Sequence, residues 1–174
     1  MRKIYILVFE IINFFDFRYR LRPLAKILDK IKIFCLIRCG SKIGNNSRIG
    51  SKVFILNYSN FEIGDNSSIE KNAEIFNYDK IIIGNNVEIG SQFYINTSNH
   101  KISNKDLPIS KQGTVNKQII IGSDIWIGAR VTILSGTIIP DRVVIGAGAV
   151  VVAKKFESKK IYAGNPAKEI KEID

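Results

Sequence analysis

Branched apolar residues recur every six positions through most of this chain, and this period limits the folds that the chain can adopt. The period runs without a break from residue 121 to residue 151, where it is carried by Ile121, Ile127, Ile133, Ile139, Ile145 and Val151. Upstream it occurs as three triplets, and the last Ile of one triplet lies eight residues before the first Ile of the next: Ile43, Ile49 and Ile55; Ile63, Ile69 and Ile75; Ile83, Ile89 and Ile95. Each triplet with its two extra residues therefore makes a unit of 20 residues.

A period of six fits neither an amphipathic helix, whose period is about 3.6, nor a single strand, whose period is 2. It fits short strands joined at regular corners, as in a parallel β-helix of hexapeptide repeats, with three sixes making one three-sided coil. The Ile residue points inward, and the residue four positions later takes a second inward position. The glycine next to the Ile residue is expected to permit the turn through a positive φ. A β-sandwich is the other interpretation, but strand alternation alone would not hold a six-residue phase for so long.

Four motifs make the chain resemble the hexapeptide-repeat acyltransferases over about residues 41–173. They are Asn99-His100, Ile125-Trp-Ile-Gly128, Ile145-Gly-Ala-Gly-Ala-Val150 and Ala163-Gly-Asn-Pro-Ala-Lys168. The resemblance is nearest to the branch of acetyl-CoA-dependent O-acetyltransferases that act on sugars and small hydroxyl compounds. It implies an all-β fold, a left-handed parallel β-helix, and the handedness comes from the resemblance alone because most crossover connections are right-handed.

The chain divides into three parts. Residues 1–40 form an N-terminal segment, in which the apolar pattern predicts two amphipathic helices over residues 3–39. Residues 41–152 form the β-helix, and residues 101–118 interrupt it as a polar loop directly after the only histidine. The resemblance implies that this loop projects toward a neighbouring subunit of a homotrimer. Residues 153–174 form a tail that is expected to end in a short helix over residues 167–173.

The N-terminal segment carries most of the net charge. The chain has a net charge of +10, and residues 1–40 hold nine Lys or Arg against three Asp or Glu, a net of +6. One predicted helical face carries Ile4, Leu7, Val8, Ile11 and Phe15. This face either only covers the open end of the β-helix, or residues 1–20, with basic residues that include Arg18 and Arg20, also contact anionic lipid at the inner membrane face.

No targeting or nucleic-acid signal accompanies this segment. The apolar run is too short to span a bilayer, and no signal-peptide cleavage site follows it, so the protein is expected in the cytoplasm. The basic excess comes without a nucleic-acid-binding motif, so no nucleic-acid partner is expected. Cys35 and Cys39 are expected to be reduced thiols packed as small apolar groups, with a disulfide as the alternative. No other Cys or nearby His completes a zinc site with them, so no metal is expected.

Acyl transfer from a thioester to a hydroxyl requires a base for the hydroxyl proton, donors for the oxyanion and alignment of the reactants. The resemblance assigns the base to His100, whose side-chain type has a pKa near neutrality, with direct transfer and no acyl-enzyme. It assigns the oxyanion donor to the backbone N–H of Ala129. It assigns contacts with acetyl-CoA to Trp126, Ala129, Ala147, Lys154, Lys155, Pro166 and Lys168. Alignment of the repeat units places the acceptor pocket at Glu70, Asn77, Tyr78, Asp79, Tyr94 and Asn99.

The favoured function is acetyl-CoA-dependent O-acetylation of a sugar hydroxyl in a surface polysaccharide or its precursor. The nearest alternative is acetylation of a free small molecule, which could be a xenobiotic, a simple glycoside or the amine of an amino-sugar. The γ-type carbonic anhydrases share this fold, but they need three histidine ligands and this chain has one histidine. A non-catalytic β-solenoid is a further alternative, although the chain lacks the regular Thr ladders typical of such proteins.

Overall fold

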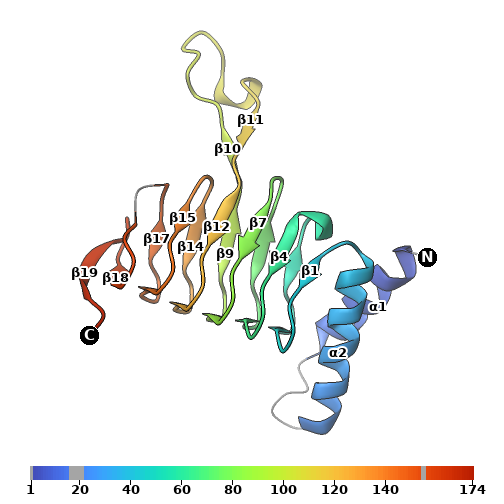
Figure 1. Ribbon diagram of the computed structural model, residues 1–174. Coiled ribbons are helices and arrows are strands. Elements are labelled where there is room, and N and C mark those ends of the chain that lie inside the picture. The colour runs from blue at the N-terminus through green and yellow to red at the C-terminus, as the bar shows by residue number, and fades with distance from the viewer. Residues whose placement is uncertain (1, 16–21, 154–155) are drawn as a thin grey trace.

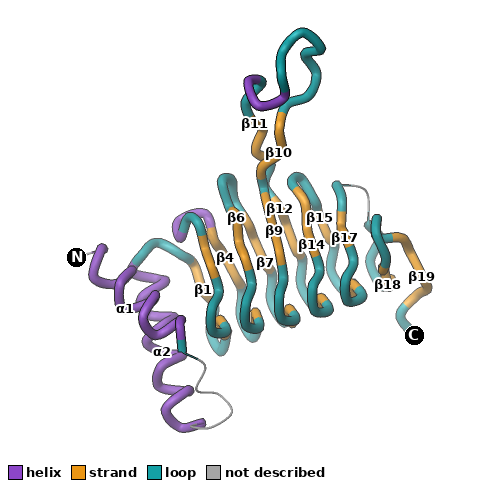
Figure 2. The backbone as a smooth tube through the Cα atoms, turned by 180° about the vertical axis from the view of Figure 1, so that it is seen from behind, coloured by secondary structure: helices purple, strands orange, loops and turns teal. Residues whose placement is uncertain are grey.

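The computed structural model describes residues 2–15, 22–153 and 156–174, and its main body is a three-sided parallel β-helix (Figure 1). Each side of the prism is one sheet, and we name the sheets A, B and C in the order in which the chain enters them. The two N-terminal helices lie against one end of the stack of coils, and the C-terminal strands lie at the other end (Figures 1 and 2). The predicted parallel β-helix is confirmed.

The strands of each sheet are short and pair with their equivalents in the neighbouring coils. Sheet A consists of β1 (Lys42–Ile43), β4 (Phe61–Ile63), β7 (Ile81–Ile83), β12 (Ile119–Ile121) and β15 (Ile138–Ile139). Sheet B consists of β2 (Arg48–Ile49), β5 (Ser68–Ile69), β8 (Val87–Ile89), β13 (Ile125–Ile127), β16 (Val143–Ile145), β18 (Lys160–Ala163) and β19 (Lys168–Glu172). Sheet C consists of β3 (Phe54–Ile55), β6 (Glu74–Phe76), β9 (Tyr94–Asn96), β14 (Thr132–Leu134) and β17 (Val150–Val151).

The residues of the six-residue period form the core. Ile127 pairs in register with Ile145 and Ile89, so equivalent Ile residues stack along the axis. All three have an exposed fraction of 1% or less. The second inward positions are equally buried, with an exposed fraction of 0% at Val53, Ala73, Val87, Val131, Val143 and Ala149. Burial of each Ile or Val side chain stabilises the fold by about 1.5–3 kcal/mol, which explains why the period persists.

The glycines beside the Ile residues serve close packing between coils. A Cβ atom added to Gly128 would lie 2.5 Å from the backbone nitrogen of Ala147 in the next coil, so only glycine fits there. Positive φ values fall two positions after such glycines or their equivalents, at Asn46, Lys52, Asn66, Asn72, Asn86, Gln92, Asp124, Arg130 and Arg142. The expectation that these glycines supply the positive φ is therefore wrong, because the turn lies beyond them and their requirement is contact between two backbones.

The insertions of the repeat lie at the corner between sheet C and sheet A. In the first coil this corner holds the 3-10 turn η1 (Tyr58–Asn60), and in the second it holds residues 77–80. In the third coil it holds an antiparallel hairpin of β10 (Ser98–His100) and β11 (Thr114–Asn116), with η2 (Ile109–Lys111) before β11. The hairpin projects away from the coils, so the polar interruption of the repeat is an arm (Figure 1).

The helices α1 (Arg2–Phe14) and α2 (Arg22–Arg38) cover the first coil with a face other than the predicted one. Phe9 and Leu36 are buried against the coil, whereas Ile4 and Leu7 are 60% and 59% exposed. Of the face with Ile4, Leu7, Val8, Ile11 and Phe15, only Val8 packs against the core, so the alternative that this whole face covers the coil is wrong, because the coil end requires polar partners. No helix among the described residues is long and apolar enough to cross a bilayer. Arg18 and Arg20 lie outside the described residues.

The C-terminal tail ends in a strand, so the prediction of a helix over residues 167–173 is wrong. The strand β18 continues sheet B beside β16, and β19 pairs with β18 antiparallel, with Ala163 opposite Lys168. Lys160 on β18 lies 2.8 Å from Glu169 on β19 and 3.2 Å from Glu157. An unpaired β18 would leave an open sheet edge, and pairing with β19 satisfies its backbone groups, which outweighs the helical propensity of Lys and Glu.

Candidate active site

Two consecutive coils leave backbone N–H groups without partners at the corner from sheet B to sheet C. At the corner from sheet A to sheet B, the residue after each glycine donates its N–H to a side chain of the next coil. The distances are 2.6 to 3.1 Å for Asn45 to Asp65, Asp65 to Asn85, Asn85 to Ser123 and Ser123 to Asp141. At the corner from sheet B to sheet C the equivalent residues are Ser51, Lys71, Ser91, Ala129 and Ala147, and the two alanines have no side-chain acceptor to offer to the coil before them.

The consequence is a pair of free donors. Within the described residues, the N–H groups of Ala129 and Ala147 have no hydrogen-bond partner, although the Ala129 carbonyl accepts the Gly148 N–H at 2.8 Å. A free N–H at a tight corner can donate to a ligand or to a developing oxyanion without prior rearrangement. We call this edge of the prism, from Ala129 through Ala147 to the C-terminal turn, the donor corner.

The donor corner ends at the C-terminal turn. The Ala167 N–H donates to the carbonyl of Val150 at 2.8 Å, and this contact fixes the turn against the last coil. Pro166 and Lys168 flank the buried Ala167 and are both exposed. The structure therefore brings four predicted cofactor residues, Ala129, Ala147, Pro166 and Lys168, to one edge of the molecule. Lys154 and Lys155 lie outside the described residues.

Trp126 lies on the outer face of sheet B, in the strand that leads to Ala129. Its side chain is 60% exposed, so it points to the surface and does not fill a corner of the coil. It lies in register with Glu88 and Val144 on the neighbouring strands. An open groove of about 490 Å³ runs beside it and is also lined by Arg142. The groove extends toward the corner from sheet A to sheet B, because Asn86 and Asp124 also line it, so it is separate from the donor corner.

The structure adds a cation that the sequence analysis did not single out. Arg130 follows Ala129, and its Nε donates to the Oε1 of Gln92 in the preceding coil at 2.8 Å. This bond holds the guanidinium at the donor corner, where it can contact an anionic ligand. A sequence signal exists, because Arg130 stands at the turn position next to the predicted oxyanion donor.

His100 lies at a different corner from Ala129. It ends β10, pairs with Thr114 of β11, and its side chain is exposed. One side of the coil separates the donor corner from the corner that carries the hairpin. A side of six residues at about 3.3 Å per residue measures about 20 Å. Within one chain, His100 and the Ala129 N–H therefore cannot act on the same substrate group.

Four of the predicted acceptor residues lie at or near the corner that carries His100. Asn99 is exposed beside His100, and Tyr94 lies on β9, which leads to it. Tyr78, which is 53% exposed, and Asp79 occupy the same corner one coil earlier. The Asp79 N–H donates to the Oγ1 of Thr97 at 2.9 Å, which ties the two coils together.

The other two predicted acceptor residues are engaged in the fold. Asn77 is 0% exposed, and its side-chain amide accepts the Asn57 N–H at 2.9 Å and donates to the Asn57 carbonyl at 2.6 Å. Its interpretation as an acceptor contact is wrong, because the repeat uses this side chain to join two coils. Glu70 lies on sheet B and forms an ion pair of 2.6 Å with Arg48. Among the described residues, no group of three or more His, Cys, Asp or Glu is placed to hold a metal ion.

Comparison with known proteins finds relatives that are named as acetyltransferases. Residues 118–153 match the family described as the hexapeptide repeat of succinyl-transferase. Over 96 residues, 47% of this chain, the sequence is 37% identical to a probable macrolide acetyltransferase of Lysinibacillus sphaericus. Over 93 residues, 49% of this chain, it is 33% identical to a putative lipopolysaccharide biosynthesis O-acetyl transferase, WbbJ, of Escherichia coli K12. These matches cover 53% and 47% of the two relatives, so the chain spans about half of their length.

A solved structure covers nearly the whole chain. A maltose O-acetyltransferase from Clostridium difficile 630 superposes with a TM-score of 0.82 at 25% identity, over 99% of this chain and 86% of that one. The six-residue repeat wound into a parallel prism defines a hexapeptide-repeat β-helix protein. Together with the matched repeat and the acetyltransferase relatives, it makes the chain similar to the hexapeptide-repeat acetyltransferases.

Proposed function

We propose that this protein transfers the acetyl group of acetyl-CoA to a hydroxyl group of a sugar, at sites between the subunits of a homotrimer. The observation that carries the proposal is the donor corner, where Ala129 and Ala147 offer unpartnered N–H groups. Its support from outside the chain is that the relatives named above are acetyltransferases. The acceptor is the sugar chain of a surface polysaccharide or its precursor.

The donor corner suits the extended arm of acetyl-CoA. The arm runs along the edge of the prism, and the Ala147 N–H donates to one of its amide carbonyls. Lys168 at the exposed C-terminal turn pairs with phosphate, and Pro166 beside it limits the path of the arm. Trp126 packs against the arm from sheet B. This arrangement delivers the thioester carbonyl to the Ala129 N–H.

The transfer is direct. The imidazole of His100 takes the proton of the acceptor hydroxyl as the hydroxyl oxygen bonds to the thioester carbonyl carbon. Negative charge develops on the carbonyl oxygen, and the Ala129 N–H stabilises it. The intermediate collapses with cleavage of the C–S bond, and the CoA thiolate takes the proton back from the imidazolium. Cys35 and Cys39 are both 2% exposed at the C-terminal end of α2, so neither is placed to form an acyl-enzyme.

The separation of His100 from Ala129 supports a site built by two chains. Because about 20 Å lie between the two corners of one prism, one chain must supply the base and its neighbour the N–H donor. A cyclic trimer repeats one such interface three times. The hairpin β10–β11 projects from the His100 corner, so it can reach across to the donor corner of the neighbouring chain (Figure 1).

Two relatives point to different acceptors. The relative named for lipopolysaccharide biosynthesis favours a sugar chain, and the exposed Tyr78 with Asp79 and Asn99 offers the aromatic and polar contacts that sugars bind. The relative named for macrolides favours the second candidate, acetylation of a free small molecule, with a hydroxyl or an amine as acceptor. Incubation with labelled acetyl-CoA and a panel of polysaccharide repeat units, amino-sugars and macrolides, followed by mass spectrometry, distinguishes them. The proposal would be contradicted if no member of the panel is acetylated and acetyl-CoA is hydrolysed equally fast by wild type and by His100→Asn.

The shared site has its own test, in which two inactive variants restore each other. His100→Asn removes the base, and Ala129→Pro removes the donor N–H at a turn whose next residue, Arg130, has a φ of 58°, a place that accepts proline. In mixed trimers formed from equal amounts, a site is complete when an Ala129→Pro chain supplies His100 and a His100→Asn chain supplies the Ala129 N–H. That probability is 1/2 × 1/2, so about a quarter of wild-type activity returns. Activity no higher than that of the two variants alone would place both groups in one chain.

A further inference from the structure

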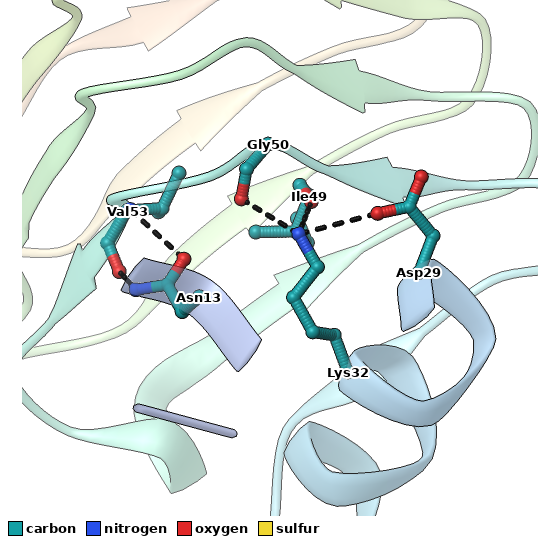
Figure 3. A network of polar contacts seen from close by, with 6 residues as sticks. All are labelled: Asn13, Asp29, Lys32, Ile49, Gly50 and Val53. Carbon is teal, nitrogen blue, oxygen red and sulfur yellow. Dashed lines mark hydrogen bonds and ion pairs between the residues drawn. The ribbon is translucent and has the colours of Figure 1, made fainter. Parts of the chain in front are cut away.

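The two N-terminal helices bury polar side chains against the β-helix. Asn13 is 5% exposed and Lys32 is 3% exposed, although both lie on helices rich in apolar residues. The Asn13 amide donates to the Val53 carbonyl at 2.9 Å and accepts the Val53 N–H at 3.1 Å. The Lys32 ammonium donates to the carbonyls of Ile49 and Gly50 at 2.8 and 3.0 Å (Figure 3).

The open end of the stack explains this polar face. The carbonyl and N–H groups of an inner coil bond to the coils on both sides, but the first coil lacks a neighbour on one side. Buried backbone groups without partners cost about 1–3 kcal/mol each, so the helices must supply polar side chains there. Asn13 and Lys32 meet this need, and the apolar rows of the helices are left to face outward.

The outward rows of the two helices carry exposed apolar side chains, which together we call the apolar helix face. It consists of Ile4, Leu7, Ile11 and Phe14 of α1, which are 54–67% exposed, and Leu24, Ile27, Ile31 and Phe34 of α2, which are 38–57% exposed. Both rows have the three- and four-residue spacing of an amphipathic helix. The two helices are in contact, since Tyr5 of α1 packs edge-on against Phe34 of α2, with ring centroids 5.9 Å apart. A set of exposed apolar side chains of this size marks an interaction site.

The charges beside this face have one sign. Five exposed cationic side chains lie on the described parts of the two helices: Arg2, Lys3, Lys26, Lys30 and Arg38. The acidic residues of the same parts are engaged in the fold, since Glu10 accepts the Tyr58 hydroxyl at 3.0 Å and Asp29 lies 3.2 Å from Lys32. The partner of the apolar helix face must therefore be apolar and anionic together.

We propose that the apolar helix face docks the protein on the anionic surface of a lipid bilayer. The two helices lie in the plane of the interface, with the Ile, Leu and Phe side chains in the acyl boundary and the basic side chains at the headgroups. A second copy of this chain is a poorer partner, because it would bring the same cationic flanks together. The helix α1, with 13 residues, is about 20 Å long, which suits a helix that lies on the membrane.

The test uses the full chain and two kinds of vesicle, phosphatidylcholine alone and phosphatidylcholine with phosphatidylglycerol. The protein should co-sediment with the anionic vesicles at low salt, and salt should weaken binding because it screens surface charge. Lys26→Gln with Lys30→Gln should lower the partition coefficient by about fivefold for each charge removed. Leu7→Gln with Ile27→Gln should lower it by about tenfold or more, since both side chains are more than half exposed. Ile170→Gln, at a residue that is 62% exposed at the other end of the molecule, is the matched control and should bind as wild type.

Insertion into the bilayer can be measured separately by tryptophan fluorescence. Trp126 is the only tryptophan of the chain, so one substitution removes the background signal. In a Trp126→Phe background, Leu7→Trp should give fluorescence that lipids brominated on their acyl chains quench, whereas Ile170→Trp should not. Wild-type protein that stays in the supernatant with anionic vesicles at low salt would overturn the proposal. So would an unchanged vesicle affinity of the Leu7→Gln, Ile27→Gln variant. If light scattering shows that this variant loses subunits while vesicle binding is unchanged, the apolar helix face is an interface between copies of the chain.

Discussion

A single side chain added at the donor corner should stabilise the coil and abolish catalysis. At the corner from sheet A to sheet B, Asn85 of one coil caps the Asp65 N–H of the preceding coil at 2.7 Å. Ala147 has the same place relative to Ala129, since both follow the glycine of their coil. In the variant Ala147→Asn, the new amide oxygen should therefore accept the Ala129 N–H.

The two effects have opposite signs. One new intramolecular hydrogen bond adds about 1 kcal/mol to the free energy of unfolding. The same bond occupies the donor that the oxyanion needs, and loss of one oxyanion donor lowers kcat by about a hundredfold to a thousandfold. The substitution adds no charge, so electrostatic repulsion of CoA does not contribute to the loss.

Chemical denaturation and the labelled acetyl transfer assay measure the two effects on one preparation. Ala147→Val is the matched control, because it adds bulk at the same position without an acceptor. A higher midpoint of denaturation with lost turnover in Ala147→Asn, and no gain of stability in Ala147→Val, is the expected pattern. If Ala147→Asn keeps wild-type kcat, the Ala129 N–H is not the oxyanion donor.

Three further outcomes follow from the described contacts. His100→Asn should lower kcat by about a hundredfold to ten-thousandfold while CoA affinity, measured by calorimetry, is unchanged, as expected on loss of a general base. Lys32→Met leaves Asp29 and the Ile49 carbonyl without their partner and should lower the free energy of unfolding by about 3 kcal/mol, whereas the exposed neighbour change Lys30→Met should have almost no effect in the same urea titration. Burial raises the pKa of both thiols, Cys35 and Cys39, so the folded protein keeps their protons while the unfolded chain loses them above about pH 8.5. Stability should therefore fall as pH rises beyond that value, less so in a Cys35→Ala, Cys39→Ala variant, and alkylation followed by mass spectrometry should find both thiols unmodified in the native protein at neutral pH.

The β-helix could be predicted because its core is a local property of the sequence. Each Ile residue of the period contacts the Ile residue one coil away, and every coil repeats the same requirement. The hairpin could be located for the same reason, since residues 101–118 interrupt the period. The shape of that interruption, a two-stranded arm, depends on pairing between β10 and β11 that the period does not encode.

The failures of prediction share one cause, which is contact between distant backbone groups. Helical periodicity identifies the most apolar face of α1, but the face that packs on the first coil is the one with Asn13, because its amide bonds to the Val53 backbone. The tail sequence from Lys168 to Glu172 favours a helix by composition, but the edge of β18 selects a strand. Asn77 has the residue type of a ligand contact, but its partner is the backbone of Asn57. In each case the deciding partner is a main-chain group, which no side-chain pattern reveals.

The same main-chain requirement explains how this fold provides a functional site without a change of architecture. A β-helix corner must turn sharply, and the turn withdraws one N–H per coil from the sheet ladder. Where the next coil supplies Asp, Asn or Ser, as at Asp65, that N–H is satisfied within the fold. Where it supplies Ala, as at Ala147, the N–H stays open at an edge that leads to exposed Pro166 and Lys168. The residue that follows the glycine position of the next coil therefore decides whether a corner is satisfied within the fold or can bind a ligand. The six-residue period determines which residue of each coil occupies that position.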